Sequence, residues 1–112
     1  MTKMKQPQRD EVLDDVRFIL NEVAMRERVS SELSDEELRM VTTYGEEAVG
    51  DWQDDLNAHA QQLQLLTPSA ANLKRIDIER QKVQRQALRI IEIYTALFIC
   101  ISERGARNIL TT

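Results

Sequence analysis

The chain has 112 residues, enough for one domain. Its three glycines and two prolines are too few for the many turns of a β-sandwich or barrel, so we exclude an all-β fold. The net charge of −4 is unevenly distributed, because residues 10–66 carry 15 acidic residues against 4 arginines, whereas residues 67–112 carry 8 basic residues against 4 acidic ones. This asymmetry favours antiparallel pairing of oppositely charged helices, or pairing of two copies.

The sequence shows no sign of secretion or of membrane insertion. Cys100 is the only cysteine and has no partner for an internal disulfide, and no basic leader precedes an apolar segment with a cleavage site. The most apolar stretch, residues 90–101, covers 12 positions, whereas a membrane span needs about 20. We therefore expect a cytoplasmic protein that does not interact with a membrane.

The first predicted helix covers residues 10–29, and residues 1–9 are expected to be flexible. Its apolar residues recur at helical spacing on one face: Val12, Leu13, Val16, Ile19, Leu20 and Val23. Phe18 and Met25 lie off this face, seven residues apart. They are either partly covered surface positions or a second contact strip, and we count Phe18 among the candidate partner contacts.

The second predicted helix covers residues 34–66. Ser34 and Glu37 have the spacing of a capping box, with Leu33 and Leu38 at the positions of a hydrophobic staple. Positions at nearly heptad spacing then form one seam: Leu38, Val41, Gly45, Ala48, Trp52, Leu56, His59, Leu63 and Leu66. Because glycine costs about 1 kcal/mol inside a helix, a kink or break near residues 45–51 is an alternative to one continuous helix.

The third predicted helix covers residues 68–104. Thr67 is the predicted cap, Pro68 suits the first turn, and Gly105 suits a left-handed C-cap. Its seam advances by alternating steps of three and four: Leu73, Ile76, Arg80, Val83, Ala87, Ile90, Tyr94, Leu97 and Ile101. We therefore predict an all-α fold over residues 1–112, in which an N-terminal helix accompanies a long antiparallel helical hairpin.

The stretch from Ile90 to Ile101 is apolar on nearly every side of the third helix. We expect the other two helices to leave Ile93, Ile99 and Cys100 uncovered, which favours a homodimer with Leu97 and Ile101 in its interface. The alternative is a monomer in which the first helix covers this surface completely.

We find no pattern typical of catalysis or of cofactor binding. His59 is the single histidine, so a metal site with two histidines cannot form within one chain. Cys100 lies among isoleucines, where a thiol is desolvated and not activated. Nucleotide-binding, zinc-protease and serine-hydrolase motifs are missing. We therefore expect no catalytic, cofactor-binding or metal-binding residues, no cofactor and no enzyme.

A basic stripe runs along the first half of the third helix and consists of Lys74, Arg75, Arg80, Lys82, Arg85 and Arg89. It could pair with the acidic second helix or with a second subunit, steer a protein partner, or lie along the phosphates of a nucleic acid. We favour pairing with the acidic helix, because no aromatic residues are interleaved in the stripe.

The organisation of residues 33–101 resembles the small all-helical antiactivators of bacterial quorum sensing, of the TraM and QslA kind. The residues that carry this resemblance are Leu33, the acidic start at 35–37, Leu38, Ala48, Leu56, Leu63, Leu66, the joint at Pro68, and Ile90, Ile91, Leu97 and Ile101. The resemblance implies a dimeric helical protein that sequesters a LuxR-type transcription factor and needs no small-molecule ligand.

The expected function is therefore that of an antiactivator, a protein-binding regulator that holds a transcriptional regulator through helical surfaces. The predicted anchors are Ile90, Ile93, Tyr94 and Phe98, with Phe18 as an outlying candidate, while Arg85 and Arg89 would steer association. Two alternatives stay open: a small DNA-binding regulator that uses the basic stripe, and a helical adaptor protein.

Overall fold

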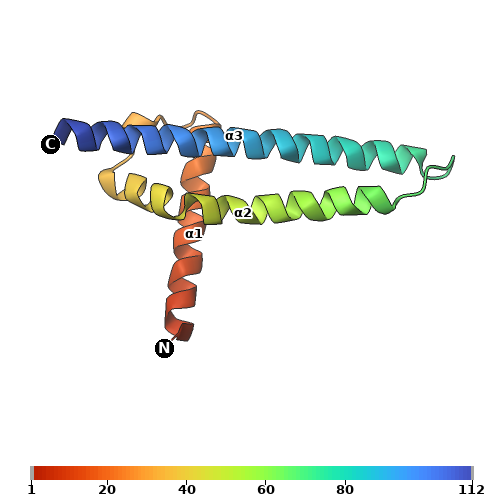
Figure 1. Cartoon of the computed structure of the whole chain (residues 1–112), viewed down its shortest axis with the longest axis horizontal. Coiled ribbons are helices and arrows are strands. Elements are labelled where there is room, and N and C mark those ends of the chain that lie inside the picture. Colours follow the sequence, from red (N-terminus) through yellow and green to blue (C-terminus); the bar gives the residue numbers. More distant parts are fainter. Residues whose placement is uncertain (1, 112) are drawn as a thin grey trace.

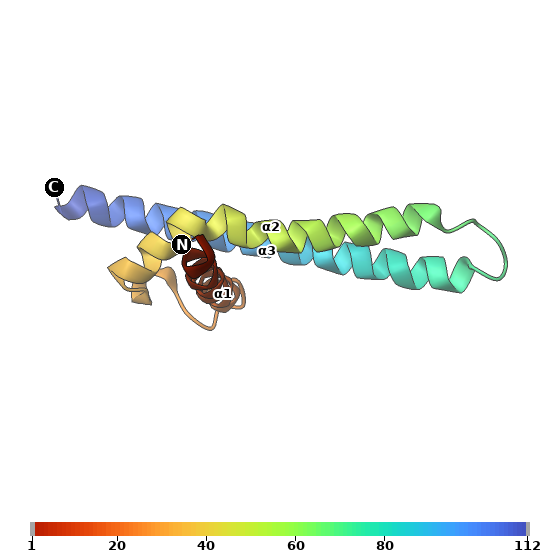
Figure 2. The ribbon, with the colours of Figure 1, turned by 90° about the horizontal axis from the view of Figure 1, so that it is seen from below.

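A computed structural model describes the backbone of residues 2–111 and the side chains of residues 9–110. The described chain is all-α, as predicted, with α1 (Thr2–Ala24), a short 3-10 helix η1 (Ser30–Glu32), α2 (Asp35–Leu65) and α3 (Leu73–Thr111) joined by loops. Figure 1 shows α2 and α3 as a long antiparallel hairpin, with α1 crossing it at a steep angle. Seen from below in Figure 2, α1 is viewed nearly end-on beside the hairpin.

The start of α2 confirms the predicted capping box. The Glu37 backbone N–H donates to Ser34 Oγ at 3.0 Å, and the Ser34 backbone N–H donates to Glu37 Oε1 at 2.9 Å. Leu33 and Leu38, at the staple positions, are both buried. The helix continues through Gly45 without the break that the two glycines suggested, because Leu97 packs on Gly45 and supports the helix there.

The predicted bounds of the first helix are wrong at both ends. α1 begins at Thr2, in a polar stretch without apolar periodicity, and includes residues predicted to lie outside the helix. It ends at Ala24, before the predicted 29, because Arg26 adopts a left-handed φ of 60°. The Glu27 backbone N–H then reaches back to Glu22 O at 2.8 Å. This closure satisfies a carbonyl at the helix end in the manner of a Schellman motif.

The predicted bounds of the third helix also need correction. Pro68 does not start it, since the loop continues to Asn72, whose Nδ2 donates to Thr67 O at 3.1 Å. Gly105 does not end it either, because α3 runs on to Thr111 and no described glycine has a positive φ. The last turns are fixed by Arg107, which pairs with Asp35 at the start of α2 at 2.9 Å. A glycine inside a helix costs only about 1 kcal/mol relative to alanine, so Gly105 does not by itself end α3.

The core lies where α1 crosses the hairpin. Its fully buried members come from all three helices, and the largest are Val16, Leu20, Leu38, Val41, Val49, Ile93 and Cys100. No residue between Val49 and Ile90 is buried, so the distal half of the hairpin consists of two helices whose facing side chains are only partly covered. The molecule is correspondingly elongated, with extents of 63 × 37 × 20 Å.

Candidate protein-binding surface

One side of α3, which we call the outer face, is exposed and uncharged. It comprises the exposed residues Leu88, Ile91, Thr95, Phe98, Ile99, Ser102 and Ala106. Ile91 and Phe98 retain 61% and 63% of their surface. At about 100° per residue, these positions lie opposite Ile93 and Leu97, which face the core. The outer face is therefore what remains of the apolar stretch after α1 and α2 have covered the other sides.

A groove runs between α3 and the segment that follows α1. It has a volume of about 660 Å³, and its α3 side includes Ile91, Thr95 and Ile99, while Arg26 and Val29 contribute to the opposite wall. A second depression of about 490 Å³ shares Thr95 and Ile99 with the groove and extends past Phe98. The outer face from Ile91 to Ala106 thus borders a shallow concave surface, a shape suited to receiving a side of another helix.

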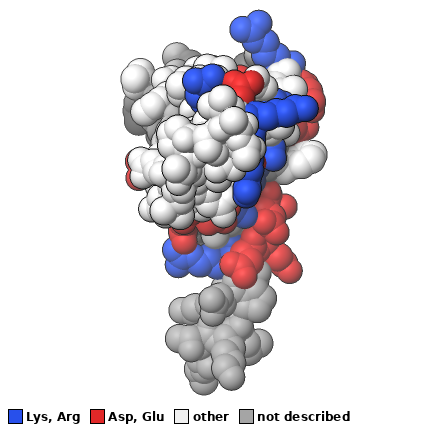
Figure 3. All heavy atoms as spheres, turned by 90° about the vertical axis from the view of Figure 1, so that its right-hand side faces the viewer, with Lys and Arg blue, Asp and Glu red and all other residues white. Residues whose placement is uncertain are grey.

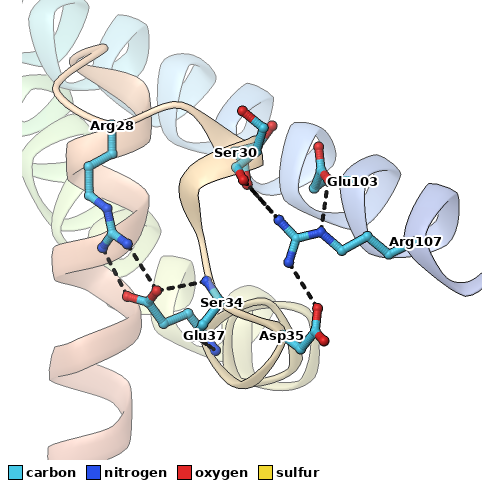
Figure 4. Close-up of polar contacts among 8 residues, drawn as sticks. Arg28, Ser30, Ser34, Asp35, Glu37, Glu103 and Arg107 are labelled. Carbon is cyan, nitrogen blue, oxygen red and sulfur yellow. Dashed lines mark hydrogen bonds and ion pairs between the residues drawn. The ribbon is translucent and has the colours of Figure 1, made fainter.

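Two arginines fix the wall of this groove (Figure 4). Arg28 donates to both carboxylate oxygens of Glu37 at 2.9 Å, and also lies 3.3 Å from Glu22. Arg107 donates to the backbone oxygen of Ser31 at 3.2 Å and to Asp35 at 2.9 Å. The segment between α1 and α2 is therefore tied to α2 at one point and to α3 at another, so the groove is already formed within one chain.

The contact between Arg28 and Glu37 shifts the pKa of both side chains. The Arg28 guanidinium, with the backbone N–H of Ser34, lowers the pKa of Glu37 to about 2. In return, the Glu37 carboxylate raises the pKa of Arg28. Each side chain keeps only about a third or less of its surface exposed, so the pair is partly shielded from solvent.

Arg26 is a groove residue that the sequence reasoning missed. Its side chain is exposed at the groove wall and has no hydrogen-bond or ion-pair partner among the described side chains. A left-handed backbone costs a residue with a Cβ about 1 to 2 kcal/mol, and glycine is the usual residue at such a helix end. The only sequence feature that pointed to a helix end near Arg26 was the loss of apolar periodicity after Met25.

Three predicted contact residues lie in the core instead. Ile90 and Ile93, predicted as partner anchors, and Leu97, predicted in a dimer interface, retain 8% of their surface or less. Ile93 and Cys100 were expected to stay uncovered, but α1 packs across this part of α3 and buries both. These residues present no surface to a partner in this fold. Their assignment as contact residues is therefore corrected.

The remaining predicted contact residues are at least partly accessible. Phe98 lies on the outer face, and Ile99, which was expected to stay uncovered, lies beside it with 44% of its surface exposed. Tyr94 is half-buried against the core, and Ile101 keeps 44% of its surface. Phe18 is exposed on α1 but does not line the groove. The structure therefore brings only Phe98, of the predicted anchors, into the concave surface.

The basic stripe pairs mainly along its own helix. Arg80 contacts Asp77 at 2.9 Å, Lys82 contacts Glu79 at 3.5 Å, and Arg89 lies 3.7 Å from Glu92. We favoured pairing with the acidic α2 within one chain or between subunits, and within the chain that prediction is wrong for these three residues. Figure 3, which faces the loop end of the hairpin, shows basic side chains along one side next to a broad uncharged surface.

The acidic side chains of α2 are instead engaged by α1. Arg9 pairs with Glu47 and Arg17 pairs with Asp51. Arg17 also donates through Nε to the backbone oxygen of Ala48 at 3.1 Å. The reason is geometric, since α1 lies across α2 and presents these arginines to it, whereas the acidic neighbours on α3 lie one helical turn from each basic residue.

The described residues hold no group of three or more histidine, cysteine or carboxylate side chains placed to bind a metal ion. Cys100 is buried, and this burial, aided by the charge of Glu103, raises the pKa of its thiol to about 11. His59 Nδ1 is buried in the hairpin without a hydrogen-bond partner. Over the described part of the chain, no helix combines the length and apolarity needed to cross a bilayer.

Comparison with known proteins gave no match of any kind. Neither the protein-family models nor the curated proteins nor the solved structures showed significant similarity to this chain.

Proposed function

We propose that this chain is a protein-binding regulator whose outer face on α3 receives a partner. The observation that carries the proposal is the exposure of Phe98 and Ile91 on an uncharged helix side with a preformed wall. Covering such a surface yields about 25 cal/mol per Å² of apolar area. Exposed apolar surfaces bordered by polar residues are typical of interaction sites.

The finer proposal is an antiactivator. In keeping with the resemblance noted above, the chain would act in the cytoplasm, form a homodimer when no regulator is bound, hold a LuxR-type transcription factor, and perform no catalysis. The energy of such a complex comes chiefly from a few apolar anchors, and Phe98 is the predicted anchor that the fold leaves accessible. Arg85, which is also exposed, would contribute mainly to the rate of association.

The pairing within the basic stripe makes nucleic-acid binding the weaker alternative. Arg80, Lys82 and Arg89 each have a carboxylate neighbour on α3, which reduces the positive charge available to phosphates. A protein that uses phosphate contacts would lose affinity steeply as salt is raised, whereas an apolar protein interface would not.

The test uses a LuxR-type regulator encoded in the same genome and a reporter that it activates. We expect co-expression of the full chain to suppress the reporter, and we expect Phe98→Asp to relieve that suppression. Leu65→Asp, at the exposed end of α2, is the matched control. It introduces the same charge on an apolar exposed residue outside the groove, so suppression should persist.

Binding of the purified proteins is then measured by calorimetry at low and moderate salt. A complex that Phe98→Asp weakens by about 10-fold or more, and that Leu65→Asp leaves unchanged, supports the proposal. The proposal fails if the purified regulator does not bind, or if both variants bind equally well. It also fails if the chain alone shifts a DNA fragment in a strongly salt-dependent manner.

A further inference from the structure

We infer that the outer face of α3 is covered by a second copy of this chain, whose α3 runs antiparallel to the first with the two-fold axis at Thr95. This inference rests on the proposed function, because both take the outer face to be a protein-binding surface. The second copy is the partner that covers this surface when no regulator is bound. Two observations point to a second copy: the spacing of the outer face and the charges on one of its flanks.

The spacing of the outer face is that of a helix–helix seam. Its central row consists of Leu88, Ile91, Thr95, Phe98 and Ser102, which advance by steps of three, four, three and four. Such a row is the heptad pattern by which two helices pack along one side. All five residues are exposed in the single chain, so this seam has no partner within the described structure.

The row is also compatible with itself when one copy is reversed. Leu88 and Ser102 lie equally far from Thr95 on opposite sides, so a two-fold axis at Thr95 places each against the other. Phe98 lies three residues after Thr95 and Ile91 four before it, so the same operation brings Phe98 of one copy to within about 1.5 Å, along the helix, of Ile91 of the second. In a two-fold interface every such contact occurs twice, so Ile91 and Phe98 of both copies are covered.

The charges on one flank favour the antiparallel arrangement. Arg85 and Glu103 lie on the same side of α3, since 18 residues separate them and about 3.6 residues make one turn. A two-fold axis perpendicular to the helices brings this flank of one copy against the same flank of the other. Arg85 lies ten residues before Thr95 and Glu103 eight after it, which leaves an offset of about 3 Å along the helix, and the long arginine side chain can span this offset to reach Glu103 of the second copy.

Both partners in this contact are able to make it. Arg85 has no ion pair within the described part of the chain. Glu103 receives one hydrogen bond from Arg107 at 2.9 Å and retains 24% side-chain exposure, and a carboxylate can accept several such bonds. A parallel arrangement in register would instead place this flank of one copy on the opposite side of the interface from the same flank of the other, so it would form no Arg85–Glu103 pair.

The groove wall lies beside the seam and enlarges the contact. Met25 and Val29 retain 52% and 59% of their surface. Val29 lines the groove, and the Met25 sulfur accepts a hydrogen bond from Arg89 of α3 at 2.9 Å. A second α3 seated on the outer face therefore lies against this wall as well as against the seam, which adds apolar area beyond that of two isolated helices.

The inference is tested on the full chain by sedimentation equilibrium. We expect a mass of twice 13.0 kDa, and we expect Phe98→Asp to produce a folded monomer. Arg85→Glu and Glu103→Arg should each weaken the dimer about 10-fold, whereas the double variant Arg85→Glu/Glu103→Arg should recover most of the affinity. Circular dichroism checks that each variant is folded.

A cross-link provides a measurement that does not depend on dissociation constants. Thr95→Cys lies on the proposed axis and should form a disulfide-linked dimer on mild oxidation, whereas Thr43→Cys, exposed on α2, should not. Arg85→Cys/Glu103→Cys should be joined between copies by a short bismaleimide, since the two sulfurs lie on one flank but too far apart for a disulfide, and a parallel pair would not allow this link between positions 85 and 103. Cys100 is buried and does not compete.

A monomer at micromolar concentration overturns the inference. So does a dimer in which Thr95→Cys forms no cross-link, or in which Arg85→Glu/Glu103→Arg recovers none of the lost dimer affinity. These outcomes are separate from failure of the proposed function. A monomer that still suppresses the reporter through Phe98 refutes only the second copy, whereas a dimer with the expected cross-links but no regulator binding refutes only the regulator.

Discussion

Leu97 of α3 occupies the space directly above Gly45 of α2. A Cβ at position 45 would overlap Leu97 Cδ1 and lie 3.2 Å from its Cδ2. Both residues are buried, so the Leu97 side chain would have to shift within the packed core to admit that Cβ. This contact joins the two long helices where α1 crosses them.

We therefore expect Gly45→Ala to destabilise the fold. Overpacking a filled core costs about 1 to 3 kcal/mol, which exceeds the gain of about 1 kcal/mol from replacing glycine inside a helix. Urea unfolding measures the net change. Gly50→Ala is the matched control, since no atom lies within 4 Å of the added Cβ, and it should stabilise by up to about 1 kcal/mol. Equal effects at the two glycines would contradict this packing.

Replacing Arg26 by glycine should stabilise the end of α1. The left-handed φ of 60° is unfavourable for arginine and easy for glycine, so Arg26→Gly should raise the free energy of unfolding by up to about 1 kcal/mol. Arg26→Ala keeps a Cβ and should bring no such gain. The melting temperatures of the unaltered protein, Arg26→Gly and Arg26→Ala are compared. A higher melting temperature in the alanine variant would show that backbone strain is not the cause.

The pair of Glu37 and Arg28 should make stability depend on acidic pH. Because folding lowers the pKa of Glu37 from 4.5 to about 2, its contribution is complete above pH 4.5 and is lost as the pH falls from there to about 2. Glu37→Gln keeps an acceptor for the cap but removes the charge, so it should cost about 1 to 2 kcal/mol at pH 7. The two proteins should become equally stable near pH 2.

The control for this prediction is Glu36→Gln, one residue away. Glu36 pairs with Arg39 in solvent, with 65% of its side chain exposed, so its removal should change the pH dependence less. Urea unfolding at a series of pH values between 2 and 7 provides the comparison. A cost for Glu37→Gln that stays constant over this range would rule out the charged pair as its origin.

The Cys100 thiol should be unreactive in the folded protein. Burial raises its pKa to about 11, so almost no thiolate is present at pH 8. We expect a thiol reagent such as 5,5′-dithiobis(2-nitrobenzoate) to modify it only as the fold opens, with full reaction in denaturant. Rapid labelling of the native protein would show that this part of α3 is accessible.

Local sequence signals determined the all-α class, the start of α2 and most of the residues that face the hairpin seam, although Leu73, Arg80 and Ile101 of the predicted third-helix seam are exposed. The capping box of Ser34 and Glu37 acts within one turn, and heptad spacing defines a helix side without any partner. Such signals could be read because their physical cause lies within a few residues. They also placed the apolar stretch at 90–101, which the structure divides between the core and the outer face.

Tertiary structure alone decided which sides of that stretch are covered, and so which residues can bind a partner. The sequence cannot state that α1 crosses the hairpin and buries Ile93, because the crossing depends on contacts between distant segments such as Arg17 and Ala48. The same holds for Gly105, which local preference places at a helix end but which lies inside α3, two residues before the Arg107 that contacts Asp35. Contacts between distant segments outweigh local preferences of about 1 kcal/mol, and they leave Phe98 exposed while Leu97 is buried.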